Sequence, residues 1–327
     1  MAETASSQDP RLAMPEVNLV RPKAPVVGRL VESSICQRGR SESFVRHVAF
    51  DVSGTPLAGN ILPGQAFGVI APGEDERGKP HALRLYSTSS PSWGEDGEGN
   101  VIATCVKRLI DERKPQKEGD DPEDHSLFLG VCSNYMCDMR VGDEAMLTGP
   151  SGKRFVLPEN PDVHDYLFLA TGTGIAPFRS MVLELLRRPS GPTPSRVALV
   201  QGVPYTTTLL YDDLFRELAE EHDNFSYHTA ISREPMADGR RGRYVHHLLQ
   251  EELGTFGPVL QNSRTLVYAC GLLGMQFGLY QMLASSGLGE PYMTIDPALA
   301  VTSPDDWTNA DMKRQIKPTH RCMIEVY

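Results

Sequence analysis

One stretch near the middle of the chain limits the possible folds more than any other. An apolar run at 167–170 enters a turn containing Gly172 and Gly174, and apolar residues at helical spacing follow at 181–186. This order predicts a strand, a tight loop and the start of a helix. Such a junction offers unpaired backbone N–H groups to a phosphate, and the glycines let a ligand approach closely. A Gly-x-Gly after a strand is also typical of a simple tight turn, so both interpretations stay open here.

The chain before this junction has a β pattern. Short apolar runs alternate with glycine- and proline-rich turns, at 26–31, 44–52, 66–70, 83–87, 101–106 and 145–148. Many short strands separated by turn signals predict an antiparallel β-barrel. The segment 112–125 is charged and rich in helix and strand breakers, so we expect a solvated loop there.

The pattern changes after residue 158. Predicted strands at 166–170, 196–202, 225–231 and 265–270 alternate with helical patterns that end near 188, 221, 253 and 285. Such alternation predicts a doubly wound parallel sheet. We therefore expect a two-domain β plus α/β chain: a disordered polar tail over 1–20, a β-barrel domain over 21–160 and an α/β domain over 161–327.

Composition narrows the classes of function. The 327 residues carry a net charge of −10, which argues against nucleic acid or a membrane surface as the main partner. The six cysteines are scattered and form no Cys-x-x-Cys pair, so neither a disulfide framework nor a metal site is expected. No apolar run is long enough for a membrane span, and the N-terminus lacks a signal-peptide layout. We expect a cytoplasmic protein, a monomer or a weak oligomer, without a transmembrane segment.

Several short motifs occur in a recognisable order. They are RLYSTSS at 84–90, GVCSNYMCD at 130–138, ATGTGIAPF at 170–178, GVP at 202–204, ISRE at 231–234, YACG at 268–271 and the terminal IEVY at 324–327. In this order, from about residue 21 to the end, the chain resembles the plant-type ferredoxin–NADP⁺ reductases. The resemblance implies an FAD-binding barrel domain followed by an NADP(H)-binding α/β domain.

The resemblance also implies roles around a flavin. Arg84 would pair with the FAD pyrophosphate, for which its fork of donors is suited, while Tyr86 would lie along the isoalloxazine and Ser87 would reach N5. Tyr327 would stack on the flavin where nicotinamide must land, and would move for hydride transfer. Glu325 would lie beside the nicotinamide as a charge or a proton relay. The implied catalytic residues are Ser87, Cys270, Glu325 and Tyr327.

The NADP site implied by the resemblance begins at the central junction. The turn 171–174 would hold the pyrophosphate. Ser232 and Arg233 suit a 2′-phosphate, whereas an acidic residue there would suit NAD. Tyr244 would stack on the adenine, with Arg240, Arg241 or Arg243 adding positive charge. The complete implied set of cofactor-binding residues is Arg84, Tyr86, Ser87, Cys105, Lys107, Gly130, Val131, Cys132, Ser133, Thr171, Gly172, Thr173, Gly174, Gly202, Val203, Pro204, Ser232, Arg233, Arg243, Tyr244, Cys270, Gly271 and Tyr327.

The chain departs from the family pattern at three places. Asp111 stands where the family often has an aromatic residue that stacks on the FAD adenine. Gly242 stands where a basic residue often precedes the adenine-stacking tyrosine. The segment 291–306 resembles an insertion. These departures put the adenine contact of FAD and part of the phosphate contact of NADP in question.

The function implied is FAD-dependent electron transfer between NADP(H) and a one-electron protein carrier, ferredoxin or flavodoxin. Both carriers are acidic and call for a basic docking face. The candidates are Arg21, Lys23, Arg38, Arg40, Lys79, Lys107 and Arg108. Three alternatives remain: a reductase component that serves an oxygenase or another pathway enzyme, an NAD(P)H-dependent flavin or quinone reductase without a protein partner, and a non-catalytic docking subunit with the same fold.

Overall fold

The computed structural model describes residues 9–41, 43–112, 121, 123–236 and 239–327. Its first half is a six-stranded antiparallel sheet in the order β4-β3-β8-β1-β2-β5. The strands are β1 (Val26–Ile35), β2 (Val45–Asp51), β3 (Ala66–Ile70), β4 (Arg84–Ser87), β5 (Val101–Lys107) and β8 (Glu144–Ser151). The two outer strands meet, because Ser89 N–H donates to the Ala103 carbonyl at 2.7 Å and the Thr104 hydroxyl donates to the Ser87 carbonyl at 2.8 Å. The sheet is thereby rolled into a barrel, as the sequence predicts.

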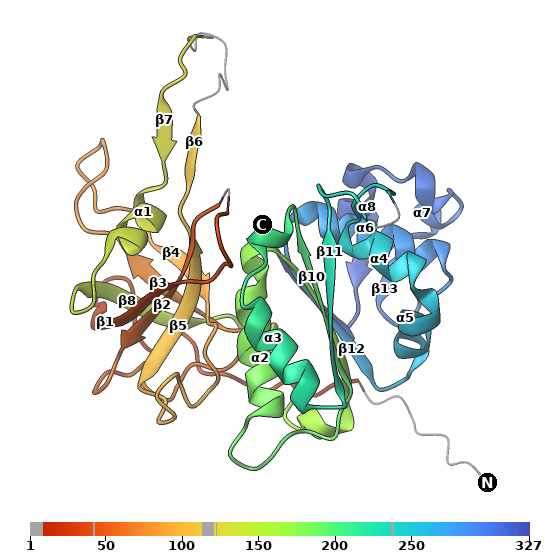
Figure 1. Cartoon of the computed structure of the whole chain (residues 1–327), viewed down its shortest axis with the longest axis horizontal. Coiled ribbons are helices and arrows are strands. Elements are labelled where there is room, and N and C mark those ends of the chain that lie inside the picture. Colours follow the sequence, from red (N-terminus) through yellow and green to blue (C-terminus); the bar gives the residue numbers. More distant parts are fainter. Residues whose placement is uncertain (1–8, 42, 113–120, 122, 237–238) are drawn as a thin grey trace.

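A hairpin and a short helix lie at one end of the barrel (Figure 1). The hairpin consists of β6 (Ile110–Glu112) and β7 (Leu127–Leu129), and α1 (Val131–Asp138) follows it directly. The sequence predicts a solvated loop over 112–125, and the described parts of that segment connect these two paired strands. The pairing was missed because the strands have only three residues each.

The second half is a five-stranded parallel sheet in the order β11-β10-β9-β12-β15. Its strands are β9 (Asp165–Thr171), β10 (Val197–Val203), β11 (Phe225–Ile231), β12 (Thr265–Gly271) and β15 (Cys322–Val326). Helices α2 (Ala176–Leu186) and α3 (Asp212–Glu221) cover the face toward the barrel. Helices α4 (Val245–Glu251), α5 (Leu253–Gln261) and α6 (Leu273–Ser285) cover the opposite face (Figure 1). Short 3₁₀ helices are η1 (Pro161–Val163), η2 (Gly172–Ile175) and η3 (Thr206–Thr208).

The segment 291–306 completes the outer side of the α/β domain, away from the barrel (Figure 1). It contains β13 (Met293–Ile295), α7 (Pro297–Ala300) and η4 (Pro304–Asp306), and α8 (Asn309–Gln315) and β14 (Ile316–Pro318) follow. Tyr292, Leu299 and Trp307 are buried in the same core as the residues of α6. This segment therefore supplies core packing to the α/β domain.

The structure corrects the predicted tail over 1–20 for the part that it describes. Asn18 N–H donates to the Pro150 carbonyl and Val20 N–H to the Gly149 carbonyl, each at 2.8 Å, and Leu12 forms a bridge with Pro158. Backbone pairing of this kind carries no periodic sequence signal. The first eight residues of the predicted tail lie outside the described part of the chain. Within the described residues no helix is long and apolar enough to cross a bilayer.

Candidate functional site

The four residues implied to be catalytic line one cavity of about 470 Å³: Ser87, Cys270, Glu325 and Tyr327. Ser87 ends β4 of the barrel, Cys270 lies at the carboxyl end of β12, and Glu325 and Tyr327 belong to the terminal strand and the residue after it. The C-terminus lies at the junction of the two sheets (Figure 1). The cavity is therefore at the carboxyl edge of a parallel sheet, where ligands of such sheets bind.

Hydrogen bonds hold the backbone and the hydroxyl of Tyr327, whereas its ring is exposed. Its backbone N–H donates to the Gly271 carbonyl at 2.9 Å, and its hydroxyl lies 2.8 Å from the Thr173 hydroxyl. The residue is nevertheless 65% exposed. One side-chain hydrogen bond and an uncovered ring suit a group that can be displaced.

Glu325 and Cys270 lie side by side on neighbouring parallel strands. The protein atoms around the cavity raise the pKa of Glu325 to about 7, although the side chain still reaches solvent. Burial raises the pKa of the Cys270 thiol to about 12, so it is a neutral thiol at physiological pH. The carboxyl group is therefore the residue here that can change its charge near neutral pH.

The two glycines of the central turn have different surroundings. A Cβ on Gly172, whose φ is 54°, would meet nothing within 4 Å, so its open side can face a ligand. A Cβ on Gly174 would lie 2.2 Å from the Cys270 carbonyl oxygen. Gly174 is thus required for the packing of the turn against β12, and only Gly172 fits the interpretation that glycine admits a ligand. The Thr171 hydroxyl accepts from Leu272 N–H at 2.7 Å and fixes the same turn.

The residues at the start of α1 fit a diphosphate. Gly130 caps this helix with no side-chain hydrogen bond, so the first backbone N–H groups of α1 are left to other acceptors. Burial raises the pKa of the Cys132 thiol in the first turn of the helix, and the charge of the exposed Arg84 on β4 lies near enough to oppose that rise in part. A guanidinium and a helix N-terminus lie together here, which is the donor set that an FAD pyrophosphate needs.

Three side chains that the resemblance assigns to cofactor binding contact other protein groups in this structure: Cys132, Ser133 and Cys105. The Cys132 thiol faces the Val69 carbonyl at 3.8 Å and the Tyr86 side chain, and the Ser133 hydroxyl donates to the Gly130 carbonyl at 3.2 Å. The thiol therefore joins α1 to the barrel strands and the hydroxyl is engaged at the start of the helix, which leaves the backbone N–H groups of its first turn for a diphosphate. The Cys105 thiol is buried, 3.6 Å from the Thr173 carbonyl. It joins the barrel to the central turn.

The hairpin above α1 holds a residue that sequence reasoning missed. Phe128 lies directly opposite Asp111 in the β6–β7 pair. Residues opposite each other in an antiparallel pair project from the same face. Phe128 is 48% exposed and stands two residues before Gly130. An aromatic side chain is therefore present on the face where Asp111 replaces the aromatic residue of the family.

The carboxyl ends of β10 and β11 bring the implied adenosine contacts together. Ser232 and Arg233 donate their backbone N–H groups to the Val203 and Pro204 carbonyls at 3.0 and 2.9 Å. Within the described residues the exposed Arg233 and Arg241 side chains form no ion pair. Tyr244 is 59% exposed and its ring stacks on that of a histidine in the first turn of α4. Gly202 is buried and packs against Val245 of α4, where it shapes the end of β10.

Arg243 forms ion pairs within the protein. Its guanidinium pairs with Glu251 at 3.2 Å and with Glu252 at 2.9 Å, so its charge is already used at the end of α4. Gly242 accepts no side chain, because a Cβ would lie 2.5 Å from the Ile231 carbonyl oxygen. The loop before Tyr244 therefore presents Arg241, and the basic residue of the family pattern would not fit at Gly242.

Two residues of the expected docking face are also engaged elsewhere. Arg38 pairs with Asp212 and Asp213, and Arg108 pairs with Asp138. Ion pairs of this kind neutralise the charge that docking would use. The other candidates are exposed and form no ion pair within the described part of the chain: Arg21, Lys23, Arg40, Lys79 and Lys107.

Comparison with known proteins agrees with this geometry. The sequence pattern of the oxidoreductase NAD-binding domain matches residues 168–279. The chain is 36% identical to a ferredoxin–NADP reductase of Synechocystis, over 95% of this chain and 70% of that protein. It is 34% identical to the chloroplastic leaf-type isozyme of Nicotiana tabacum, over 95% of this chain and 79% of that protein. The solved structure of a Plasmodium falciparum ferredoxin–NADP⁺ reductase with 2′P-AMP has the same fold, with a TM-score of 0.69, 20% identity and coverage of 96% and 100% of the two chains.

Fold and site together define an oxidoreductase in which a barrel and a nucleotide-type sheet share one cavity. The chain belongs to the ferredoxin–NADP⁺ reductase family. It is an NADP-dependent flavoprotein of electron transport, with FAD and NADP(H) as its cofactors.

Proposed function

We propose that this protein transfers electrons between NADP(H) and ferredoxin through the cavity at the junction of its two domains. One observation carries the proposal. Ser87, Cys270, Glu325 and Tyr327 come from distant parts of the sequence and line a single cavity. A docking subunit without activity would have no reason to keep this set together.

FAD, when bound, takes up a hydride from nicotinamide and releases its electrons singly. The protein's own residues orient the partners. Arg84 and the N-terminus of α1 would hold the flavin diphosphate, and the open side of Gly172 would admit the nucleotide diphosphate. The exposed ring of Tyr327 would give way when nicotinamide enters the cavity. Glu325, when ionised, stabilises the positive charge that the nicotinamide gains as it loses hydride.

Arg233 and Arg241 are the residues that we propose for the 2′-phosphate, with Tyr244 as the adenine platform. Arg243 is excluded because its charge is paired. Phe128 is proposed as the aromatic surface for the FAD adenine in place of the missing residue at Asp111. The division into a barrel domain over 21–160 and an α/β domain over 161–327, the use of flavodoxin as a second carrier, a monomeric or weakly oligomeric state and a cytoplasmic location belong to the same proposal.

The test is steady-state reduction of ferricyanide by FAD-loaded protein with NADPH and with NADH, followed by the same measurement with ferredoxin and with flavodoxin. A strong preference for NADPH supports the roles of Ser232, Arg233 and Arg241, and equal rates would refute them. No turnover in protein that holds FAD would refute the proposed function and favour a docking subunit. Ferredoxin-dependent turnover should fall as salt rises, because the remaining basic residues dock an acidic carrier.

A further inference from the structure

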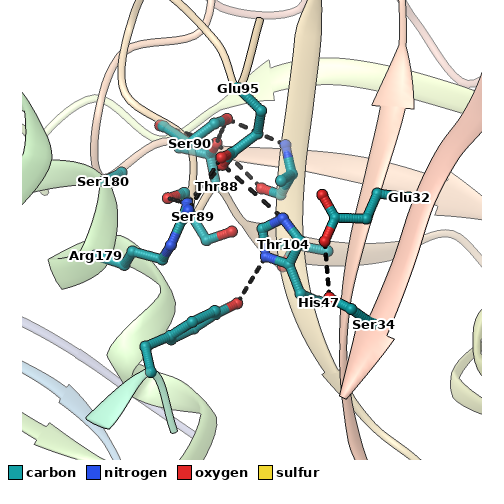
Figure 2. Close-up of polar contacts among 12 residues, drawn as sticks. Glu32, Ser34, His47, Thr88, Ser89, Ser90, Glu95, Thr104, Arg179 and Ser180 are labelled. Atoms are coloured by element: carbon teal, nitrogen blue, oxygen red, sulfur yellow. Dashed lines mark hydrogen bonds and ion pairs between the residues drawn. The ribbon is translucent and has the colours of Figure 1, made fainter. Parts of the chain in front are cut away.

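A buried polar cluster joins the two domains, and none of its members is among the proposed cofactor contacts. We define the junction cluster as His47, Ser89, Glu95, Arg179 and Tyr211. His47 lies on β2, Ser89 and Glu95 lie in the loop after β4, Arg179 is on α2 and Tyr211 precedes α3. The cluster therefore brings four segments of the chain together, two from the barrel and two from the α/β domain, and Figure 2 shows the contacts around Arg179, Glu95 and His47.

Arg179 is the centre of the junction cluster. Its guanidinium donates to both carboxylate oxygens of Glu95, at 2.5 and 3.0 Å, and to the Ser89 carbonyl at 2.7 Å. It also lies 5.1 Å from the centre of the Tyr211 ring. Figure 2 shows the Arg179 side chain extending from its helix toward Ser89 and Glu95. A two-pronged arginine–carboxylate pair fixes direction as well as distance, so it limits rotation of α2 relative to the barrel.

His47 and Tyr211 lie beside the Arg179–Glu95 pair. The Tyr211 hydroxyl lies 2.9 Å from His47 Nδ1, and His47 Nε2 lies 4.0 Å from Glu95. Burial and the neighbouring Arg179 lower the pKa of His47 to about 4, so the ring is neutral and adds no charge to the pair. Tyr211 has a φ of 55°, a left-handed conformation that a bulky residue adopts only when its surroundings impose it.

The junction cluster lies next in sequence to two segments that are proposed to contact the cofactors. Ser89 follows Ser87 by two residues, so the loop held by Arg179 is the direct continuation of the flavin strand β4. Helix α2 is the direct continuation of the turn 171–174. A second contact supports the first, because Glu184 of α2 accepts from the Ser92 N–H and hydroxyl at 2.9 and 3.0 Å.

We infer that Arg179 is a positioning residue for hydride transfer: through Glu95 and Ser89 it fixes the central turn, and with it the nicotinamide, against the strand that carries Ser87. This inference rests on the proposed function. It predicts that breaking the Arg179–Glu95 pair impairs hydride transfer and leaves the binding of each cofactor intact. Each cofactor should still bind to its own domain, but the two rings should meet in the wrong geometry, for which an error of about 1 Å can cost on the order of 10²-fold in rate.

The experiment compares Arg179→Gln and Glu95→Gln with the wild type. FAD content is read from flavin absorbance, and the α/β domain alone is probed by the affinity for 2′-phospho-AMP, which lacks nicotinamide. Hydride transfer is followed by rapid anaerobic mixing with saturating NADPH. The long-wavelength charge-transfer absorbance reports contact between the two rings. Arg188→Gln is the matched control, because Arg188 also donates to both oxygens of one carboxylate, through Nη2 to Asp162 at 2.9 and 2.8 Å, within the α/β domain.

We expect both junction variants to keep their FAD and to bind 2′-phospho-AMP within about two-fold of the wild type. Hydride transfer should slow by about 10- to 100-fold with a weaker charge-transfer band. The double variant should be no slower than Arg179→Gln, because both changes break one interaction. Should Arg179→Gln fail to fold, Glu95→Gln decides alone. Wild-type rates in the junction variants, or a loss of 2′-phospho-AMP affinity as large as the loss of rate, would overturn the inference. An FAD-loaded wild type that NADPH does not reduce would refute the proposed function itself.

Discussion

The substitution Gly174→Ala tests whether the central turn is positioned by β12, as its packing indicates. The added Cβ would lie 2.2 Å from the Cys270 carbonyl oxygen and 2.8 Å from the Gly271 Cα. Ordinary contact begins at 3.4 Å, so the turn and the strand end must separate by about 1.2 Å. Both neighbours are backbone atoms, which cannot turn away as a side chain can.

The expected loss of stability and activity follows from the displacement of the turn and of the end of β12. Overpacking of this kind costs about 1–3 kcal/mol of stability. The displaced strand end carries Cys270, which lines the cavity. A displacement of about 1 Å at a reacting centre costs on the order of 10²-fold in rate. We therefore expect a large fall in kcat for NADPH oxidation and little change in the affinity for 2′-phospho-AMP.

Gly172→Ala is the matched control for this variant. Its Cβ meets nothing in the protein, but its φ of 54° costs an alanine about 1–2 kcal/mol. The two variants are thus similar in stability, so thermal unfolding does not separate them and steady-state kinetics does. Gly172→Ala should raise KM for NADPH, because we propose that its open side admits the nucleotide, and should leave kcat nearly unchanged. A normal kcat in Gly174→Ala, or an equal loss of kcat in both, would refute this reasoning.

Three further predictions concern single side chains. Phe128→Ala should weaken FAD binding by about 1–3 kcal/mol, the usual value of base–aromatic stacking. Fluorescence titration of the apoprotein measures the affinity, and Leu127→Ala on the opposite face is the control. Equal affinities in the two variants would exclude the stacking. Glu325 ionises as the pH rises through about 7, so hydride transfer from NADPH should accelerate over that range in the wild type. Glu325→Gln should give a slow, flat profile, and a wild-type profile in that variant would contradict the role. Arg233→Ala should raise KM for NADPH about 10-fold and leave KM for NADH unchanged, since only NADPH carries the 2′-phosphate; a rise for both would point to a structural effect.

The sequence predicts the two-domain fold because each half carries a strong local signal. Short strands with turn residues mark the barrel, and strand–helix alternation marks the parallel sheet. The central junction is predicted for the same reason, since strand, glycines and helix are contiguous. The family resemblance that the motifs carry implies that Ser87, Cys270, Glu325 and Tyr327 share one site, and the four line one cavity.

Other features depend on contacts between distant segments and have no local signal. Gly172 and Gly174 are equivalent in sequence, and only the position of the Cys270 carbonyl distinguishes them. Arg243 is one of several arginines in its loop until α4 brings Glu251 and Glu252 beside it. Phe128 becomes a candidate only through the register of the β6–β7 pair.

The ends of the two sheets explain why the site lies where it does. Strand β15 ends the order of the second sheet, and β4 ends the order of the first, where the Ser89–Ala103 and Thr104–Ser87 hydrogen bonds join its end to β5. The carboxyl ends of β4 and of the β12–β15 pair lie around the same cavity. The site thus forms where the two sheets end. The motif on β4 and the motifs on β12 and β15 identify it only when they are taken together.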